Sequence, residues 1–265
     1  MFGYNTFSVS RERISSSVST WQGFSLPCGN PVEFKPDMHD PLLSVIIPTF
    51  NEALTLPELL NRVMIVPVEK EVLIVDDGST DGTSDFLKGI TDERIHLLRH
   101  DINRGKGAAI RTALPHARGK FVIIQDGDLE LDPMDYLVLL QAIHDSDGVV
   151  YGSRNLKPRK GKFYLLYWIG GMALTQIANT LYGFQLTDET TGYKLFRASL
   201  VRSLNLKCDG FEFCAEVTAK LGMRKVCIKE VPISYSPRKF EEGKKIRWTD
   251  GLKAIWTLLK LRVVG

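Results

Sequence analysis

The chain has 265 residues, of which 44% are hydrophobic and 25% are charged, a composition typical of an ordinary soluble globular protein. This length suits one large α/β domain with additions, or at most two small domains. The net charge of +3 is too small to indicate nucleic acid as a partner. The four cysteines form no C-x-x-C pair and have no histidine at zinc-site spacing, so we expect no zinc site and free thiols in a reducing compartment.

Residues 1–41 are rich in Ser, Pro and Gly and show no sustained periodicity, so we expect a poorly ordered extension there. They contain no apolar core segment of the kind found in a signal peptide. We therefore expect a cytosolic protein whose folded domain spans residues 42–265.

From residue 43 onward, apolar strand-like runs alternate with helical patterns. The runs span residues 43–47, 71–75, 95–98 and 120–124. The helical patterns between them span residues 54–63, 86–90 and 108–114. Ser79 or Thr80 is expected to cap the second of these helices. Because strands that alternate with helices form parallel sheets with right-handed crossovers, the predicted fold class is α/β, with a mostly parallel sheet flanked by helices and amphipathic helices near the C-terminus.

Each of the four strand-like runs is followed by a polar cluster. The clusters are residues 48–52, 76–77, 103–107 and 126–130. Ligands bind such sheets at the carboxyl ends of the strands, so all four clusters are expected to face one crevice. Asp126, Asp128 and Glu130 alternate along the chain, so their carboxylates could converge on a Mg²⁺ or Mn²⁺ ion; the alternative is a polar loop that only caps a strand. The chain lacks a G-x-G-x-x-G after its first strand and any P-loop motif, which makes dehydrogenases and P-loop NTPases poor fits.

Several motifs in this order resemble the family 2 glycosyltransferases with a GT-A fold. Within them, the chain is similar to the group of dolichol-phosphate mannose synthase and related polyprenyl-phosphate glycosyltransferases. The motifs that carry the resemblance are residues 45–52, 75–83, 103–107, 125–130, 149–154, 191–197 and 241–246. The resemblance covers roughly residues 43–262. Two positions depart from the usual pattern: Gly127 stands where the family has Ala, and Glu130 stands where some members have Gln.

The resemblance implies that Asp128 and Glu130 are primary ligands of Mg²⁺ or Mn²⁺, with Asp126 bound directly or through water. A divalent ion that bridges the donor diphosphate neutralises the charge of the leaving group. The donor is expected to be a nucleotide sugar, either a GDP- or a UDP-hexose, with mannose or glucose as the sugar.

The same resemblance implies contacts from Pro48, Glu52 and Asp76 to the base and ribose of the donor. Asp76 is preferred over the adjacent Asp77, which we expect to be a structural cap. Lys106 is expected to place a positive charge near the phosphates; the alternative is a surface lysine that precedes a helix.

Positively charged side chains are expected to bind the phosphates of donor and acceptor. Arg154 follows another strand-like run, and the resemblance assigns an arginine there to the acceptor phosphate. Arg238, Lys244 and Lys245 lie in a charge-dense segment that could close over donor and acceptor like a lid, the alternative being a disordered polar loop. Asp128, Arg154 and Arg238 are thus the predicted catalytic residues, and Lys244 is a predicted donor-binding residue.

The expected reaction is an inverting, in-line displacement with a polyprenyl phosphate as the acceptor. A phosphate monoester has a second pKa of ~6, so its oxygen is already anionic near neutral pH and needs no strong base. The alternative acceptor is a saccharide hydroxyl, which would need a general base. Asp188 or Glu189 is the candidate base, although a structural role in capping a turn is as plausible.

Two segments suggest contact with a membrane surface. Residues 163–187 contain no charged residue, but the polar residues in the second half disfavour a transmembrane span; a helix on the bilayer surface is preferred over one buried in the core. Residues 248–262 form a second possible surface helix. Residues 237–262 also contain eight basic and three acidic residues, which suits a phosphate-rich ligand or an anionic membrane, although Lys253 and Lys260 would equally fit a solvated helix face. We expect a peripheral enzyme at the cytoplasmic face of a membrane, or one with a membrane-anchoring partner.

Two other classes of protein fit the sequence less well. A catalytically silent nucleotide-sugar-binding protein is disfavoured because every expected carboxylate is present. A nucleotidyltransferase would show a glycine-rich loop with Arg or Lys after its first strand, where this chain has Pro48-Thr49-Phe50-Asn51-Glu52.

Overall fold

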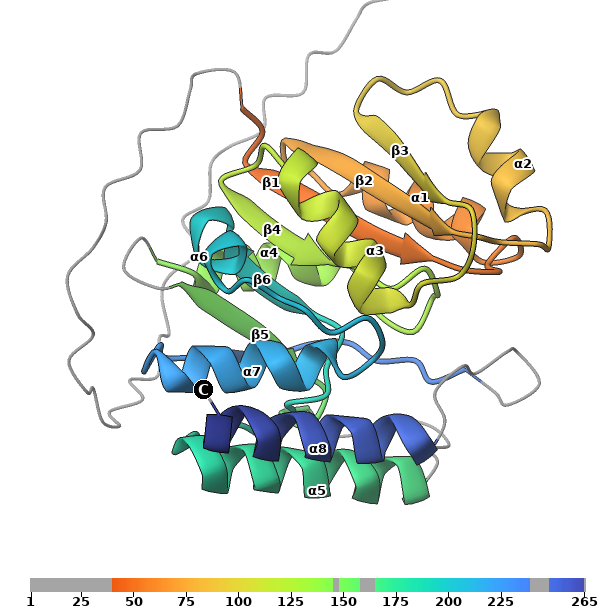
Figure 1. The fold of residues 1–265 in the computed structure, drawn as a ribbon. Helices are drawn as coiled ribbons and strands as arrows, with labels where there is room; N and C mark the ends of the chain where they lie inside the picture. Colours follow the sequence, from red (N-terminus) through yellow and green to blue (C-terminus); the bar gives the residue numbers. More distant parts are fainter. Residues whose placement is uncertain (1–39, 145–147, 158–164, 239–247, 265) are drawn as a thin grey trace, which may run out of the picture.

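The computed structural model describes residues 40–144, 148–157, 165–238 and 248–264. Its centre is a seven-stranded sheet in the order β3-β2-β1-β4-β6-β5-β7 (Figure 1). The predicted extension at residues 1–41 lies almost wholly outside the described residues. The predicted α/β class with a mostly parallel sheet is confirmed.

The first half of the chain forms four parallel strands in the predicted places. They are β1 (Leu43–Thr49), β2 (Lys70–Asp77), β3 (Ile95–His100) and β4 (Phe121–Ile124). β1 lies between β2 and β4, with Val45 opposite Val72 on one side and Ile123 on the other. β2 and β3 extend two residues beyond their apolar runs, because Asp76 pairs with Arg99 and Asp77 pairs with His100.

Helices cover both faces of this sheet. One face packs against α1 (Leu56–Ile65), α2 (Thr83–Lys88) and α4 (Tyr136–Ala142), and the other against α3 (Lys106–Ala113), α6 (Ala198–Ser203) and α7 (Phe213–Met223). Successive residues of a strand point to opposite faces, so Val45 and Ile47 belong to one core and Ile46 to the other. This explains why the strands are continuous apolar runs rather than alternating ones.

The second half of the chain adds strands of mixed direction. β6 (Lys194–Arg197) lies between β4 and β5 (Val149–Ser153) and is antiparallel to both. β7 (Lys229–Pro232) is parallel to β5 at the edge of the sheet.

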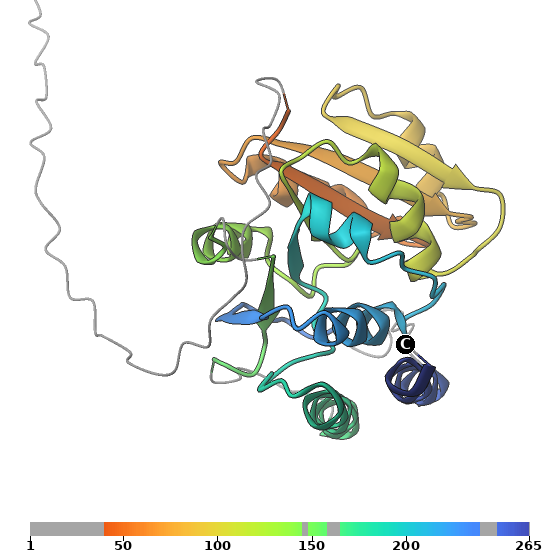
Figure 2. The same ribbon diagram turned by 60° about the vertical axis from the view of Figure 1, so that its left-hand side comes forward.

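Beyond α7, two long helices form an outer layer. α5 (Leu165–Tyr182) and α8 (Trp248–Val264) lie side by side and pack on α7 on the side away from the sheet (Figures 1 and 2). Their shared core contains Ala178, Ala215, Ala219 and Ala254, whose small side chains let the three helices approach closely, together with Leu258. Over the ranges that the structure describes, no helix has both the length and the apolar character needed to cross a membrane.

The predicted cap of α2 is wrong. Gly82, with a φ of 95°, precedes the helix, and the Asp81 carboxylate accepts a hydrogen bond from the backbone N–H of Thr83 at 3.1 Å. Ser79 instead accepts a hydrogen bond from the backbone N–H of Asn51 at 3.0 Å, and Asp81 also accepts one from Ala53 at 3.0 Å. The polar residues before α2 therefore hold the loop after β1, which carries Glu52.

Candidate active site

The loops at the carboxyl ends of β1, β2 and β4 are joined by direct hydrogen bonds. The Thr55 hydroxyl donates to the backbone carbonyl of Gly127 at 3.0 Å, and the backbone N–H of Glu52 donates to the Thr83 hydroxyl at 3.0 Å. Pro48 is half-buried in the last part of β1. A Cβ at Gly127 would lie 3.3 Å from the Glu52 side chain and 3.5 Å from the Pro48 carbonyl. The predicted residues Pro48 and Glu52 are thus brought beside the 126–130 segment.

Arg238 lies at the centre of the acidic side chains. Its guanidinium contacts Asp128 at 2.5 Å and Glu52 at 3.2 Å, and its backbone N–H donates to Glu130 at 3.0 Å. Only 14% of the Arg238 side chain is exposed. Its Nε is buried with no hydrogen-bond partner among the described residues and lies 3.8 Å from Glu130. One arginine therefore faces three carboxylates.

The electrostatic balance of this cluster remains negative. Four acids, Glu52, Asp126, Asp128 and Glu130, face two bases, Lys106 and Arg238. Burial, together with the charges of Asp126 and Glu130, raises the pKa of Asp128 to about 7, because the opposing charge of Arg238 offsets these effects only in part. The site therefore has capacity for additional positive charge.

Lys106 is a buried partner of Asp126 rather than a surface lysine. It is the first residue of α3, its side chain is 13% exposed, and its ammonium group forms an ion pair with Asp126. Burial lowers the pKa of Lys106, but the charge and hydrogen bond of Asp126 and the weaker effects of other nearby groups together outweigh burial, so the net shift is upward. Lys106 therefore stays charged at this edge of the sheet.

The predicted convergence of the three carboxylates of Asp126, Asp128 and Glu130 is not realised in this conformation. Asp126 pairs with Lys106, whereas Asp128 and Glu130 face Arg238. Within the described ranges, no group of three or more His, Cys, Asp or Glu side chains is arranged to hold a metal ion. The donor set nevertheless fits a hard divalent cation, since it consists of carboxylate oxygens with excess negative charge. Asp128 and Glu130 would hold such an ion in place of the Arg238 guanidinium.

A buried polar network that the sequence did not predict lies behind the 126–130 segment. Gln125 has no exposed surface; its carbonyl oxygen accepts hydrogen bonds from the hydroxyls of Tyr136 and Tyr193, both at 2.6 Å, and its amide donates to the backbone carbonyl of Asp126 at 3.0 Å. Gly192 also lies close, because a Cβ there would be 2.5 Å from the Asp126 carboxylate. The one signal in the sequence was a glutamine directly after a buried apolar strand.

Asp76 and Asp77 have different local roles. Asp77 accepts hydrogen bonds from His100 at 2.6 Å and from the backbone N–H groups of Arg104 and Gly105 at 2.9 and 2.7 Å, so it fixes the loop that leads to Lys106. Asp76 accepts hydrogen bonds from the backbone N–H of Ser79 at 3.0 Å and from the Ser84 hydroxyl. The structural role expected of Asp77 fits this geometry, and the donor-binding role of Asp76 stays a prediction.

Arg154 is held in a fixed orientation by Asp188. Two guanidinium nitrogens donate to the two Asp188 oxygens at 2.7 and 2.8 Å, one also donates to Thr190 at 2.8 Å, and the guanidinium carbon lies 5.2 Å from the ring centre of Tyr235. Burial raises the pKa of Asp188, but the charge and hydrogen bonds of Arg154 outweigh burial and hold the pKa below its usual range. A carboxylate with this low proton affinity is poorly suited to act as a base.

Glu189 is the other candidate base. Its side chain is buried, and it accepts a hydrogen bond from the Thr218 hydroxyl at 3.0 Å. Burial raises its pKa above the usual range. These contacts fit the structural role that the sequence left open.

The predicted phosphate-binding residues Lys244 and Lys245 lie outside the described residues.

Comparison with known proteins assigns the family. Residues 44–204 match the family model described as Glycosyl transferase family 2. The chain is similar to an undecaprenyl-phosphate mannosyltransferase from Micrococcus luteus, with 32% identity over 82% of this chain and 97% of the relative. It is also similar to a dolichyl-phosphate beta-glucosyltransferase from Saccharomyces cerevisiae, with 28% identity over 86% of this chain and 76% of the relative.

Its fold is similar to that of glucosyl-3-phosphoglycerate synthase from Mycobacterium tuberculosis, solved in complex with Mn²⁺, uridine diphosphate and phosphoglyceric acid. The TM-score is 0.63 at 16% identity, over 85% of this chain and 80% of that chain. The expected GT-A fold is thereby confirmed. The chain belongs to glycosyl transferase family 2 and is a glycosyltransferase.

Proposed function

We propose that this glycosyltransferase moves a hexose, either mannose or glucose, with inversion from a GDP- or UDP-linked donor to a polyprenyl phosphate of the dolichyl type. The reaction would depend on Mg²⁺ or Mn²⁺. The observation that carries the proposal is the acidic cluster of Asp128, Glu130 and Glu52 beside Lys106 at the carboxyl ends of the parallel strands. The similarity to an undecaprenyl-phosphate mannosyltransferase from Micrococcus luteus and to a dolichyl-phosphate beta-glucosyltransferase from Saccharomyces cerevisiae supports both the sugar and the lipid.

The donor would bind with its diphosphate over this cluster. Asp128 and Glu130 would hold the divalent ion, whose charge favours departure of the nucleoside diphosphate. Lys106 would add a second positive charge near the phosphates, and Glu52 and Asp76 would contact the nucleoside. Because Arg238 pairs with both Asp128 and Glu52, it would exchange these partners for donor phosphate when the donor binds.

The acceptor phosphate would bind Arg154. Asp188 fixes the plane of the Arg154 guanidinium, which limits the rotamer freedom lost when a phosphate oxygen is bound. The acceptor oxygen is anionic near pH 7, so the displacement at the anomeric carbon needs orientation rather than proton removal. The saccharide-hydroxyl alternative is less well supported, since Asp188 is paired with Arg154 and Glu189 is buried.

The outer layer of α5 and α8 would lie on the cytoplasmic face of the membrane that contains the acceptor. Of the 19 exposed large hydrophobic side chains in the described ranges, ten belong to these two helices. They are Tyr167, Trp168, Ile169 and Met172 on α5, and Trp248, Leu252, Trp256, Leu259, Val263 and Val264 on α8. Aromatic side chains favour the headgroup region of a bilayer. A membrane-anchoring partner that covers the same surface is the alternative.

A donor panel tests this function. The purified chain is incubated with GDP-mannose, UDP-glucose and other nucleotide sugars, with polyprenyl phosphate and with Mg²⁺ or Mn²⁺, while nucleoside diphosphate release and lipid-linked sugar are measured. We expect one donor to give both products in equal amounts. Transfer only to a saccharide hydroxyl, with none to the lipid phosphate, would contradict the proposal.

A further inference from the structure

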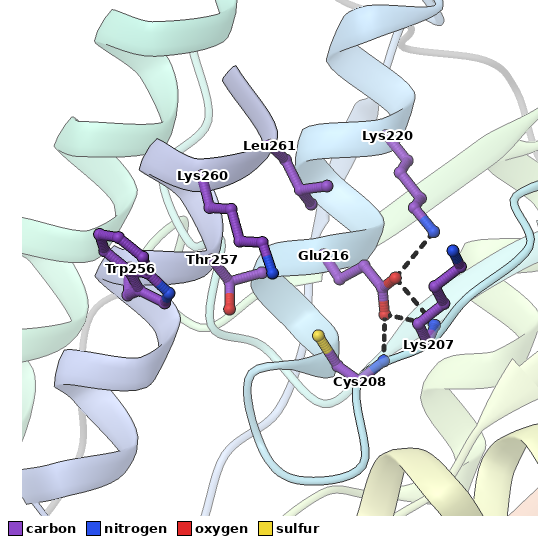
Figure 3. A pocket seen from close by; sticks show the side chains of 8 residues that line it. All are labelled: Lys207, Cys208, Glu216, Lys220, Trp256, Thr257, Lys260 and Leu261. Atoms are coloured by element: carbon purple, nitrogen blue, oxygen red, sulfur yellow. Dashed lines mark hydrogen bonds and ion pairs between the residues drawn. The ribbon is translucent and has the colours of Figure 1, made fainter. Parts of the chain in front are cut away.

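A pocket whose lining shares no residue with the acidic cluster lies between α7, α8 and the loop that precedes α7 (Figure 3). Its volume is about 240 Å³. It is lined by Lys207, Cys208, Glu216, Lys220, Trp256, Thr257, Lys260 and Leu261. Trp256 and Lys260 extend from α8, whereas Glu216 and Lys220 extend from α7 (Figure 3). None of these residues belongs to the acidic cluster or to the surroundings of Arg154.

The pocket carries a surplus of positive charge. Its one acid, Glu216, is buried and accepts hydrogen bonds from the backbone N–H groups of Lys207 and Cys208, both at 2.8 Å, and from the Lys220 ammonium at 2.7 Å. Glu216 is thus already satisfied. Lys207 and Lys260 form no ion pair with any residue in the described ranges. Both side chains are exposed, and their ammonium groups lie on opposite sides of the Glu216 carboxylate, so each is available to an anion (Figure 3).

The pocket opens beside the exposed apolar stripe of α8. Trp248, Leu252, Trp256, Leu259 and Val263 are all exposed and recur at helical spacing, so they form one stripe along the outer side of α8. Trp256 is 66% exposed and belongs to both the stripe and the pocket lining. A tryptophan beside lysine ammonium groups at the edge of an apolar surface matches the headgroup level of a bilayer.

We propose that this pocket binds the phosphate group of an anionic phospholipid when the α5 and α8 layer lies on a bilayer. The proposal rests on the membrane placement given under Proposed function and adds a defined headgroup site to it. Lys207 and Lys260 would contact the phosphate oxygens, and Trp256 would lie against the glycerol and upper acyl region. The bound lipid would orient the enzyme and would not be the glycosyl acceptor.

Vesicle binding tests the pocket with a matched control. The full chain is sedimented with phosphatidylcholine vesicles that contain or lack phosphatidylglycerol. Lys207→Gln with Lys260→Gln removes two positive charges from the pocket, and Lys253→Gln with Arg262→Gln removes two from exposed positions of α8 outside it. Since diffuse attraction to an anionic surface is worth about 1 kcal/mol per basic residue, the control pair should weaken binding to phosphatidylglycerol vesicles by roughly 30-fold at most. The pocket pair should weaken it by more than the control pair does, because it also removes direct contacts to the lipid phosphate. Equal losses from the two pairs would overturn the proposal, because they indicate diffuse attraction.

Filling the pocket without changing its charge gives a second test. Thr257→Phe, and independently Leu261→Phe, should reduce binding to phosphatidylglycerol vesicles while binding to pure phosphatidylcholine and the melting temperature stay as in the wild type. If either variant folds and still binds phosphatidylglycerol vesicles as the wild type does, the pocket is not the site that binds the lipid phosphate. Binding of inorganic phosphate as tight as that of the vesicles would refute the assignment to a lipid.

Measuring sugar transfer in the absence of phospholipid distinguishes failure of the lipid-binding proposal from failure of the proposed function. In detergent micelles without phospholipid, all four variants should transfer sugar to polyprenyl phosphate at the wild-type rate, because no pocket residue contacts the acidic cluster. Failure of the wild-type enzyme in micelles would refute the proposed function, whereas wild-type turnover with unselective vesicle binding would refute only the pocket.

Discussion

The buried network behind the 126–130 segment makes a quantitative prediction through Tyr136 and Tyr193. Each hydroxyl donates to the same oxygen of Gln125 at 2.6 Å, and all three side chains have no exposed surface. Tyr193→Phe removes one hydrogen bond but leaves the Gln125 oxygen bonded to Tyr136, so it should cost about 1 kcal/mol of unfolding free energy. Tyr136→Phe should cost about the same for the same reason.

The double variant should cost more than the sum of the two single variants. With both hydroxyls gone, the Gln125 oxygen is buried without these donors, which adds roughly 1–3 kcal/mol and brings the total to about 3–5 kcal/mol. Urea denaturation of the wild type, both single variants and the double variant measures the coupling. Because Gln125 also bonds the Asp126 backbone, the double variant should raise the KM for the nucleotide sugar. Strict additivity of the single effects would refute the shared-acceptor geometry.

Three further predictions follow from other parts of the structure. Burial raises the pKa of Glu71, but hydrogen bonds from Ser44 and Arg118 outweigh burial and hold it below the ordinary value of 4.5. The difference in unfolding free energy between the wild type and Glu71→Gln should therefore be fully present above about pH 4.5 and should be lost as the pH falls through the lower pKa of the folded state. A difference that does not change with pH would contradict this. Arg154→Lys keeps the charge but loses the bidentate geometry, so the KM for polyprenyl phosphate should rise about tenfold or more with unchanged nucleotide affinity, and equal losses of both would argue against an acceptor role. Deletion of residues 1–39 should leave transfer largely intact, and a folded but inactive product would show that the catalytic domain includes this segment.

The sequence predicted the first half of the fold well for a physical reason. β1 and β2 are buried on both faces, so their residues form apolar runs that few other structures produce. β6 was not predicted, because it begins with Lys194, a charged residue that is buried in the structure. Its ammonium donates to the backbone carbonyls of Glu189 and Thr191 at 2.7 and 2.8 Å, so tertiary contacts alone allow this lysine inside the sheet.

The candidate site was predictable only in part. Because the carboxyl ends of parallel strands lie at one edge of the sheet, the sequence predicted that Glu52, Lys106 and Asp128 lie near one another. The sequence could not reveal that Arg238 fills the space between carboxylates that lie 186 and 110 positions away along the chain. Nor could it show that Asp126 pairs with Lys106 rather than joining Asp128. Both pairings depend on tertiary packing.

The most direct test of the central claim is the metal dependence of sugar transfer to polyprenyl phosphate by the wild type and by Asp128→Asn. The wild type should transfer sugar only with Mg²⁺ or Mn²⁺ and should lose transfer on chelation. Asp128→Asn should fold with an unchanged melting temperature and lose roughly 10²-fold or more in kcat, since it removes a proposed ligand of the ion that stabilises the leaving diphosphate. Undiminished transfer by Asp128→Asn, or by the wild type after chelation, would contradict the account.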